Sequence, residues 1–327
     1  MMKWADKPYH CLDYEMKRRF GEKVYRLALN GGMTCPNRDG TLGTRGCIFC
    51  SSGGSGDFAA SAALSVTEQI QLQKNMIRQK RPVRKFIAYF QAYTNTYAPV
   101  DYLEAIFLEA LADDEVVALS VATRPDCLPP DVLELLDRLN RIKPVWVELG
   151  LQTVHAATAK LIRRGYELPC FEQAVSQLRA RNIEVIVHTI LGLPHETKEQ
   201  MLETVRYLND CDIQGIKLQL LHILRGTDLA DYYAQSPFHI MTMEEYTDIL
   251  IECLEQLSPD IIIHRITGDG PGGLLIAPLW SRNKRTVLNT IHSALRIRGT
   301  WQGRALERAA DLKQEEYPCQ NHLHCTS

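Results

Sequence analysis

The feature that most constrains the fold of this 327-residue chain is a regular alternation of short apolar runs with amphipathic stretches. The apolar runs predict strands at residues 24–29, 85–90, 116–121, 145–151, 183–191, 216–223 and 261–266. The amphipathic stretches predict helices at 101–111, 130–139, 156–163, 171–181, 198–209 and 244–257. Three helix starts carry a capping box, in which Ser or Thr precedes Glu or Gln by three residues: Ser65 with Glu68, Thr197 with Gln200, and Thr242 with Glu245.

Most of the predicted strands are continuous apolar runs, which is typical of parallel strands covered on both faces. The alternation of strands with helices implies right-handed crossovers between parallel neighbours. We therefore predict an α/β fold with six or seven strand–helix units, arranged as a partial parallel barrel of the (β/α)6 type. In barrels of this kind the active site lies at the carboxyl ends of the strands.

Both ends of the chain depart from this pattern. Residues 1–22 are charged and aromatic without a clear period, so they are predicted to form an N-terminal extension of a core domain over 23–270. Residues 271–308 are markedly basic and are predicted to form a helical C-terminal extension. The polar tail over 309–327 has the composition of a disordered segment.

Composition is that of an ordinary globular protein, with 45% hydrophobic and 23% charged residues. The formal net charge of −2 excludes a global basic field, so any contact with RNA needs a local patch. The N-terminus lacks the apolar region of a signal peptide, and no apolar run approaches the length of a membrane span. We therefore expect a cytoplasmic protein without membrane contact.

Three cysteines, Cys35, Cys47 and Cys50, lie on one glycine-rich loop, with eleven residues between the first two and two between the last two. Three thiolates can hold a metal centre and leave one position for another ligand. Structural zinc normally needs four ligands in two pairs, and here only Cys47 and Cys50 form a pair. A redox Cys-x-x-Cys pair lies at a helix N-terminus, whereas flexible residues 51–56 follow this pair. A metal or cluster site is the favoured interpretation, with these two as alternatives.

The loop, TCPNRDGT at 34–41 with GCIFC at 46–50, resembles the cluster loop of the radical SAM superfamily. The common superfamily spacing is three residues and then two, whereas eleven and then two resembles one bacterial subfamily, related to the radical SAM domain of the Elongator catalytic subunit. The resemblance continues through YFQAYTNTY (89–97), ATRPD (122–126), ELGLQT (148–153), LGLPHET (191–197), TGDGP (267–271) and WSRNK (280–284). Several motifs in the same order make it specific.

The resemblance implies that Cys35, Cys47 and Cys50 each ligate one iron of a 4Fe–4S cluster. The fourth iron then takes the amino and carboxylate groups of S-adenosylmethionine (SAM). One-electron reduction cleaves SAM to a 5′-deoxyadenosyl radical, which abstracts hydrogen from a substrate. The cofactor carries that chemistry and the protein directs it.

Polar motifs at the predicted strand ends suit cofactor binding. The resemblance implies that Thr94 and Asn95 hold the methionine amino end of SAM, with an ordinary polar turn as the alternative. It also implies that Glu148 and Gln152 bind the ribose hydroxyls or the amino-acid end. The alternative for these two is a satisfied, buried polar pair.

Thr123 and Arg124 end the next strand and are also predicted to bind the cofactor. An arginine can bind a carboxylate through two parallel hydrogen bonds. The alternative for Arg124 is a structural ion pair with Asp126. His188 lies inside an apolar strand, where a histidine is more often a packed, hydrogen-bonded residue than a catalyst.

Three residues are predicted to contact the substrate. Lys217 and His222 are placed with Gln219 on one polar face of the sixth strand. Asp269, in the TGDGP motif, follows the last strand; a glycine-flanked turn aspartate is the alternative.

The basic stretch that follows combines cations with Trp280 and Trp301, as an RNA-facing surface does, although an amphipathic helix with a solvated basic face is favoured. In the tail, the spacing of Cys319, His322, His324 and Cys325 is too weak to predict a metal site.

The subfamily resemblance implies a tRNA substrate, with conversion of the wobble nucleoside 5-carboxymethylaminomethyluridine to 5-aminomethyluridine. Expected partners are tRNA, an electron donor such as flavodoxin or ferredoxin, and a separate SAM-dependent methyltransferase that acts on the product. One alternative is a radical SAM enzyme acting on a small molecule or a protein. Another is a non-enzymatic, zinc-binding RNA adaptor.

Overall fold

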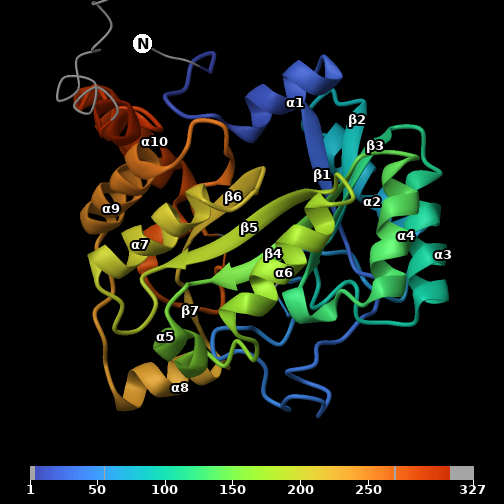
Figure 1. Ribbon diagram of the computed structural model, residues 1–327, viewed down its shortest axis with the longest axis horizontal. Helices are drawn as coiled ribbons and strands as arrows, with labels where there is room; N and C mark the ends of the chain where they lie inside the picture. The colour runs from blue at the N-terminus through green and yellow to red at the C-terminus, as the bar shows by residue number, and fades with distance from the viewer. Residues whose placement is uncertain (1–3, 55, 269, 310–327) are drawn as a thin grey trace, which may run out of the picture.

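The computed structural model describes residues 4–54, 56–268 and 270–309. Seven parallel strands form one sheet in the order β1-β2-β3-β4-β5-β6-β8, with β1 and β8 at its two edges. Their bounds are Val24–Leu29 (β1), Lys85–Phe90 (β2), Val116–Thr123 (β3), Val145–Gln152 (β4), Glu184–Leu191 (β5), Gly215–Leu220 (β6) and Ile262–Arg265 (β8). The predicted parallel α/β fold is confirmed as a sheet curled into a half-barrel (Figure 1).

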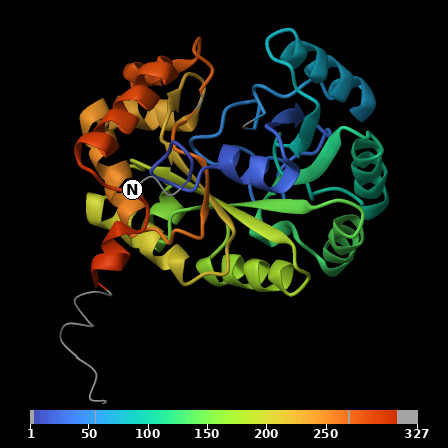
Figure 2. The same ribbon diagram turned by 90° about the horizontal axis from the view of Figure 1, so that it is seen from above.

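Helices follow the strands and cover the outer face of the curled sheet (Figures 1 and 2). Their bounds are Leu12–Phe20 (α1), Val66–Arg78 (α2), Val100–Leu111 (α3), Pro130–Asn140 (α4), Ala156–Leu161 (α5), Leu168–Arg179 (α6), Lys198–Asn209 (α7), Asp228–Gln235 (α8), Met243–Gln256 (α9) and Lys284–Ile297 (α10). Two 3₁₀ helices, η1 (Pro125–Cys127) and η2 (Leu279–Arg282), are also present. All three predicted capping boxes are present, at the starts of α2, α7 and α9. Within the described residues, no helix is both long enough and apolar enough to cross a membrane.

The N-terminal extension contains a helix, α1, which the sequence pattern did not predict. In the view from above, α1 lies at the centre of the ring of helices (Figure 2). Its Met16 packs against side chains of β2 to β5 inside the half-barrel. The helix therefore plugs the barrel. Only a short face of α1 is buried, which explains why the hydrophobic residues of this segment show no clear helical period.

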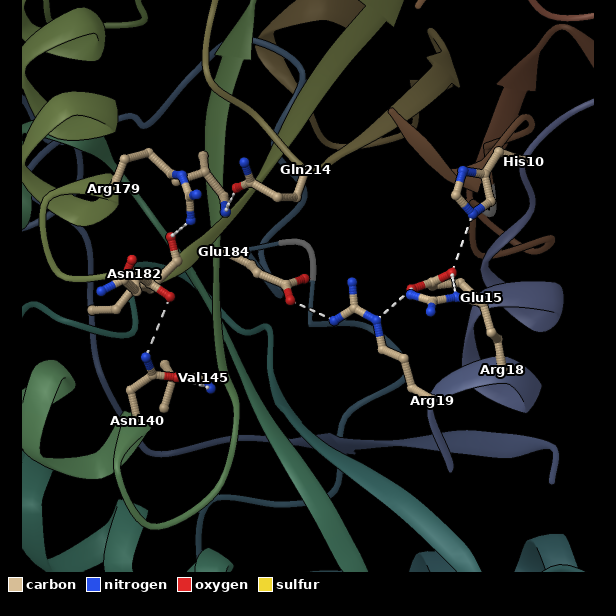
Figure 3. Close-up of polar contacts among 12 residues, drawn as sticks. His10, Glu15, Arg18, Arg19, Asn140, Val145, Arg179, Asn182, Glu184 and Gln214 are labelled. Atoms are coloured by element: carbon tan, nitrogen blue, oxygen red, sulfur yellow. Dashed lines mark hydrogen bonds and ion pairs between the residues drawn. The ribbon is translucent and has the colours of Figure 1, made fainter. Parts of the chain in front are cut away.

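Ion pairs within α1 and to β5 hold this plug in place (Figure 3). Buried Glu15 accepts hydrogen bonds from Arg18 at 2.6 Å and Arg19 at 2.5 Å, and Arg19 also pairs with Glu184 at the start of β5. The hydrogen bond from Arg18, with that from Arg19, lowers the pKa of Glu15 to about 2.

The predicted sixth strand is wrong at its end. Strand β6 stops at Leu220, because the chain turns away after the Leu221 N–H donates to the Leu191 carbonyl at 3.0 Å. The next residues form β7 (Ile223–Leu224), which pairs antiparallel with β9 (Leu275–Ala277) in a separate two-stranded sheet. His222 therefore lies outside the strand that carries Lys217.

The basic C-terminal extension packs against the barrel. Helix α10 buries Val287, Ile291 and Leu295, which join the main core. The Trp280 indole donates to the Met241 carbonyl at 2.9 Å, so this ring is a packing group as well as a surface one. The predicted domain boundaries stay predictions, and the tail with Cys319 to Cys325 lies outside the described residues.

Candidate active site

The concave face of the half-barrel is built in layers, because side chains two residues apart on a strand point the same way. The lowest layer is apolar and comprises Ile87, Ala118, Trp146 and Ile186 on β2 to β5, closed by Met16 of α1. Two residues further along the same strands lie Tyr89, Ser120, Glu148 and His188. The apolar layer therefore forms a dry base beneath a polar layer.

Glu148 is the centre of the polar layer. Its Oε1 accepts from Ser120 Oγ at 2.9 Å, and its Oε2 lies 2.6 Å from His188 Nε2. Lys217 Nζ donates to the same Oε2 and lies 3.1 Å from the Tyr89 hydroxyl. The guanidinium of Arg26, on β1, lies 3.3 Å from Oε1. Glu148 therefore contacts residues of β3, β5, β6 and the edge strand β1, and Lys217 links it to Tyr89 on β2.

The electrostatics of this layer favour an ionised Glu148. Burial by itself would raise the pKa of this carboxyl, but the charges of Lys217 and Arg26 lower the pKa well below its usual range. Burial, together with the charge of Lys217, lowers the pKa of His188 to about 4. At neutral pH His188 is therefore uncharged and Glu148 is a carboxylate.

A pocket with a cavity volume of about 140 Å³ opens above the polar layer. We call it the cluster pocket, because Cys35, Cys47 and Cys50 all line it. Tyr89, Glu148 and His188 contribute to its lining from below. The structure thus brings the three-cysteine loop and the polar layer to one cavity.

The cysteine loop is held in place by its neighbours. Arg38 donates to the carbonyls of Cys50 at 3.2 Å and Ser51 at 2.6 Å. Asn37 Nδ2 lies 3.4 Å from the Cys47 sulfur and donates to the Arg163 carbonyl at 2.8 Å. The cysteine side of the pocket is therefore fixed by contacts from within the loop and from the segment after α5.

The donor set of this pocket fits a 4Fe–4S cluster. All three cysteines are reduced thiols that line the pocket. Among the described residues, no three His, Cys, Asp or Glu side chains are placed to hold a single metal ion. A cluster does not need such convergence, because each thiolate binds a different iron.

Five predicted cofactor residues line the cluster pocket with the cysteines: Thr94, Thr123, Arg124, Glu148 and Gln152. Gln152 has a left-handed backbone, with φ of 66°, where the register of β4 against β5 shifts. A Cβ on Gly150 would lie 2.7 Å from Gln152 Nε2, so a larger residue there would require the Gln152 amide to shift. Local backbone geometry therefore aims Gln152 at the cavity.

Arg124 adopts the structural alternative. Its Nε and Nη2 donate to the two carboxylate oxygens of Asp126 at 2.9 and 2.7 Å, and its Nη1 donates to the Arg164 carbonyl at 2.9 Å. Glu148 also has the satisfied, buried arrangement that was its alternative. These two residues line the pocket while their charges are engaged by protein groups.

Asn95 lies behind the pocket wall. It is fully buried and its Nδ2 donates to the Ala122 carbonyl at 2.8 Å. Its Oδ1 is buried without a hydrogen-bond partner among the described residues. The structure therefore separates Asn95 from its neighbour Thr94, which does line the pocket.

Of the three predicted substrate residues, the structure describes Lys217 and His222, and it places them apart. Lys217 is 1% exposed and lies in the polar layer. His222 lies away from it, with Nε2 3.0 Å from Ser281 Oγ. Asp269 lies outside the described residues.

Sequence reasoning missed Arg26 and Tyr89 and gave little weight to His188. A signal was present, because each is a polar side chain within a largely apolar strand. Arg164 and Tyr166 were also missed; they follow α5, and no periodic pattern marks them as pocket residues.

A second pocket, which we call the edge pocket, lies along the open edge between β1 and β8. Its lining includes residues of α1, β1, β8 and the start of α10. Its charged members are Lys7, Lys23, Arg26, Arg265, Lys284 and Asp13. Five basic side chains and one acid, among the described residues, make this opening positively charged.

Comparison with known proteins agrees with this geometry. A family model described as "Radical SAM superfamily" matches residues 40–208, and one described as "Radical_SAM C-terminal domain" matches residues 213–296. "Uncharacterized protein YtqA" of Bacillus subtilis (strain 168) is 46% identical over 93% of this chain and 94% of its own length. A "tRNA uridine(34) acetyltransferase" of Dehalococcoides mccartyi (strain CBDB1) is 25% identical over 59% of this chain but only 43% of its own length.

Among solved structures, the archaeal Methanocaldococcus infernus Elp3 with an N-terminal deletion superposes with a TM-score of 0.66 at 15% identity. The match covers 85% of this chain and 64% of the Elp3 chain, and it shows a shared fold. Proteins of the matched superfamily use a 4Fe–4S cluster and SAM, and the three free cysteines of the cluster pocket suit that cofactor pair. The chain therefore belongs to the radical SAM superfamily and is an enzyme of that class.

Proposed function

We propose that this enzyme modifies the wobble uridine of tRNA, converting 5-carboxymethylaminomethyluridine to 5-aminomethyluridine. The observation that carries the proposal is the basic edge pocket, because an excess of Lys and Arg at the mouth of a site attracts the phosphate backbone of RNA. The acetyltransferase from Dehalococcoides mccartyi supports the choice of nucleotide, since its name gives uridine 34 of tRNA.

The cluster pocket supplies the cofactor site of this proposal. Cys35, Cys47 and Cys50 ligate the cluster, and Thr94, Thr123 and Gln152 contact SAM from the strand ends. Arg124 and Asn95 hold the pocket wall from behind. When bound, the two cofactors supply a 5′-deoxyadenosyl radical.

The glycine-like methylene of the substrate is the proposed hydrogen donor, because its radical is stabilised by the nitrogen on one side and the carboxylate on the other. The methylene would lose one hydrogen atom to the radical that the bound cofactors supply and one electron to the oxidised form of the electron carrier, and the nitrogen would lose its proton, which leaves a carbon–nitrogen double bond. Water adds to this bond, and its collapse releases the amine of 5-aminomethyluridine and a two-carbon aldehyde acid. The dry base beneath the polar layer limits water to the open side of the pocket.

The reaction needs partners. A low-potential carrier such as flavodoxin or ferredoxin is the proposed source of the electron that cleaves SAM. A separate SAM-dependent methyltransferase is proposed to act on the amine that this enzyme produces.

Mass spectrometry of tRNA nucleosides from a deletion strain tests the proposal. We expect 5-carboxymethylaminomethyluridine to accumulate at the expense of 5-aminomethyluridine and its methylated form, with reversal by the plasmid-borne gene. Unchanged nucleoside levels would refute the assignment. The control is a plasmid carrying the chain with Cys35, Cys47 and Cys50 all replaced by Ala, which should not reverse the accumulation.

The alternative of a small-molecule or protein substrate makes a different prediction. It requires no salt-dependent affinity for tRNA, whereas the tRNA proposal requires an affinity that falls steeply between 50 and 200 mM salt, on the order of 10-fold or more for a few phosphate contacts. The zinc-adaptor alternative has lost its basis, because the chain belongs to a superfamily of enzymes.

A further inference from the structure

Arg26 occupies the boundary between the two pockets. It lies on the edge strand β1 and lines the edge pocket, and its side chain is 19% exposed. On its other side, its Nη2 lies 3.3 Å from Oε1 of Glu148, which lines the cluster pocket. A group that enters through the edge pocket therefore meets Arg26 before it reaches the polar layer.

The charge of Arg26 is only partly compensated by its contacts. Glu148 already pairs with Lys217, which is the more buried cation and the closer one. The nearby histidines add no further positive charge that would compete for Glu148, because burial lowers the pKa of His188 to about 4 and that of His264 well below its usual range. Arg265, on β8, brings a further guanidinium to the edge pocket and has a contact of its own. Arg26 and Lys217 thus share one carboxylate.

The hydrogen bonds of Arg26 also leave part of its guanidinium without a partner in the described part of the chain. Its Nη2 contacts Glu148 and lies 2.7 Å from His264 Nδ1, while its Nε–H is buried without an acceptor among the described residues. A buried donor left without an acceptor is costly. Since Nη2 is already engaged, an incoming carboxylate would satisfy the Nε donor through one oxygen, in a charge-assisted hydrogen bond.

We propose that Arg26 binds the carboxylate of the substrate at the boundary between the cluster pocket and the edge pocket. Lys217 acts as a positioning residue: it neutralises Glu148, which keeps the guanidinium of Arg26 available to an incoming anion. The inference rests on the proposed function, in which that carboxylate belongs to the glycine unit of the modified uridine. The enzyme would then recognise the unit that it removes, and the product, which lacks the carboxylate, would lose this contact and leave.

The methionine carboxylate of SAM is a second source of the same chemical group. The cysteines lie near other arginines, among them Arg124, whose electrostatic neighbours include Cys35 and Cys47. The charged neighbours of Lys217 are instead Glu148, Arg26 and Arg265. This separation favours the substrate carboxylate at Arg26.

The test compares two nucleosides that differ in one charge, 5-carboxymethylaminomethyluridine and its methyl ester. Equilibrium binding of each is measured on the full-length, cluster-loaded enzyme with SAM present. We expect the wild type to bind the acid on the order of 10- to 100-fold more tightly than the ester, which is the usual contribution of a hydrogen bond between two charged groups. Arg26→Gln should lose that preference while its affinity for the ester stays unchanged, and Arg26→Lys should keep part of it.

A matched control is Arg141→Gln, since Arg141 is 76% exposed at the end of α4 and pairs with Asp137. It should keep the full preference for the acid. Equal binding of acid and ester by the wild type would overturn the inference, and this arm needs no variant to fold. An Arg26→Gln enzyme that keeps its acid preference but binds SAM more weakly would also overturn it, because the carboxylate at Arg26 would then be that of SAM.

The inference and the proposed function fail separately. If the wild type prefers the acid through Arg26 yet leaves wobble uridine in tRNA unmodified, the carboxylate site stands and the proposed reaction falls. If the wild type converts tRNA while binding acid and ester equally, the reaction stands and the role of Arg26 falls.

Discussion

Two arginines on opposite sides of the half-barrel, Arg124 and Arg26, show how differently this molecule treats a buried positive charge. Arg124 lies beside the cysteine loop and is paired through two hydrogen bonds with Asp126, two residues along the chain. Arg26 lies at the open edge and shares Glu148 with Lys217, and its Nε has no acceptor among the described residues. The charge of Arg124 is balanced by a neighbour in the sequence, and the pair holds the pocket wall. Within the part of the chain that the structure describes, the charge of Arg26 is balanced only by a carboxylate shared with Lys217, which leaves Arg26 able to bind a ligand.

The largest expected effect tests the cysteine side of this comparison. Replacing Cys35, Cys47 and Cys50 together by Ala should abolish the iron–sulfur absorbance and SAM cleavage of the anaerobic protein, because no thiolate is then left on the pocket wall. The control is Cys170→Ala on α6, which should leave both unchanged. SAM cleavage by the triple variant at the wild-type rate would contradict the cluster assignment.

The next effect tests the open-edge side. Glu148→Gln removes the carboxylate between Lys217 and Arg26 and leaves two buried cations without an anion. We expect the free energy of unfolding to fall by about 3–5 kcal/mol, measured by denaturant titration.

A double variant sharpens this prediction. Removing one of the two cations as well, in Glu148→Gln with Lys217→Met, should recover part of the lost stability, because fewer buried charges stay unpaired. A double variant less stable than Glu148→Gln alone would show that the two cations do not depend on that carboxylate.

The matching change beside the cysteine loop should cost less. Asp126→Asn removes the partner of Arg124, but Arg124 keeps its hydrogen bond to the Arg164 carbonyl and Asp126 is partly exposed. We expect a loss of about 1–3 kcal/mol in the free energy of unfolding. A loss as large as that of Glu148→Gln would remove the distinction between the two sides.

The smallest effect concerns Glu15, a carboxylate balanced within its own helix at the base of the barrel (Figure 3). Its pKa is about 2 in the folded protein, against an ordinary value of 4.5. A lowered carboxyl pKa stabilises the fold above the unfolded pKa, and this contribution is lost as pH falls from about 4.5 to about 2. Glu15→Gln should therefore lose less stability than the wild type across that window in acid titrations. An identical slope for both proteins would refute this role.

Much of the fold follows from local pattern. Strands β1 and β2 and helix α7 begin and end at the predicted residues, because each apolar run or capped helix carries its own boundary signals. The end of β6 and the helix α1 were not predicted from the sequence, since both depend on contacts with distant segments. The turn after Leu220 is accompanied by a hydrogen bond to Leu191, and α1 is held by packing into the barrel.

The residues of the site also fall into a group that was predicted from the sequence and a group that was not. The three cysteines were predicted and line one pocket, as do Thr94, Thr123 and Gln152. Arg26 and Tyr89 were not predicted. A single polar residue in an apolar strand does not reveal which other strands it faces.

The sequence by itself determined the parallel α/β architecture and the three-cysteine loop, because period, capping and spacing are properties of adjacent residues. Only the tertiary structure decided which charges share a partner. Lys217 meets Glu148 across 69 residues of chain, and Arg26 meets His264 across 238. The curling of the sheet brings these side chains into contact, because it turns one face of every strand toward a common interior. It also leaves β1 and β8 apart at the open edge.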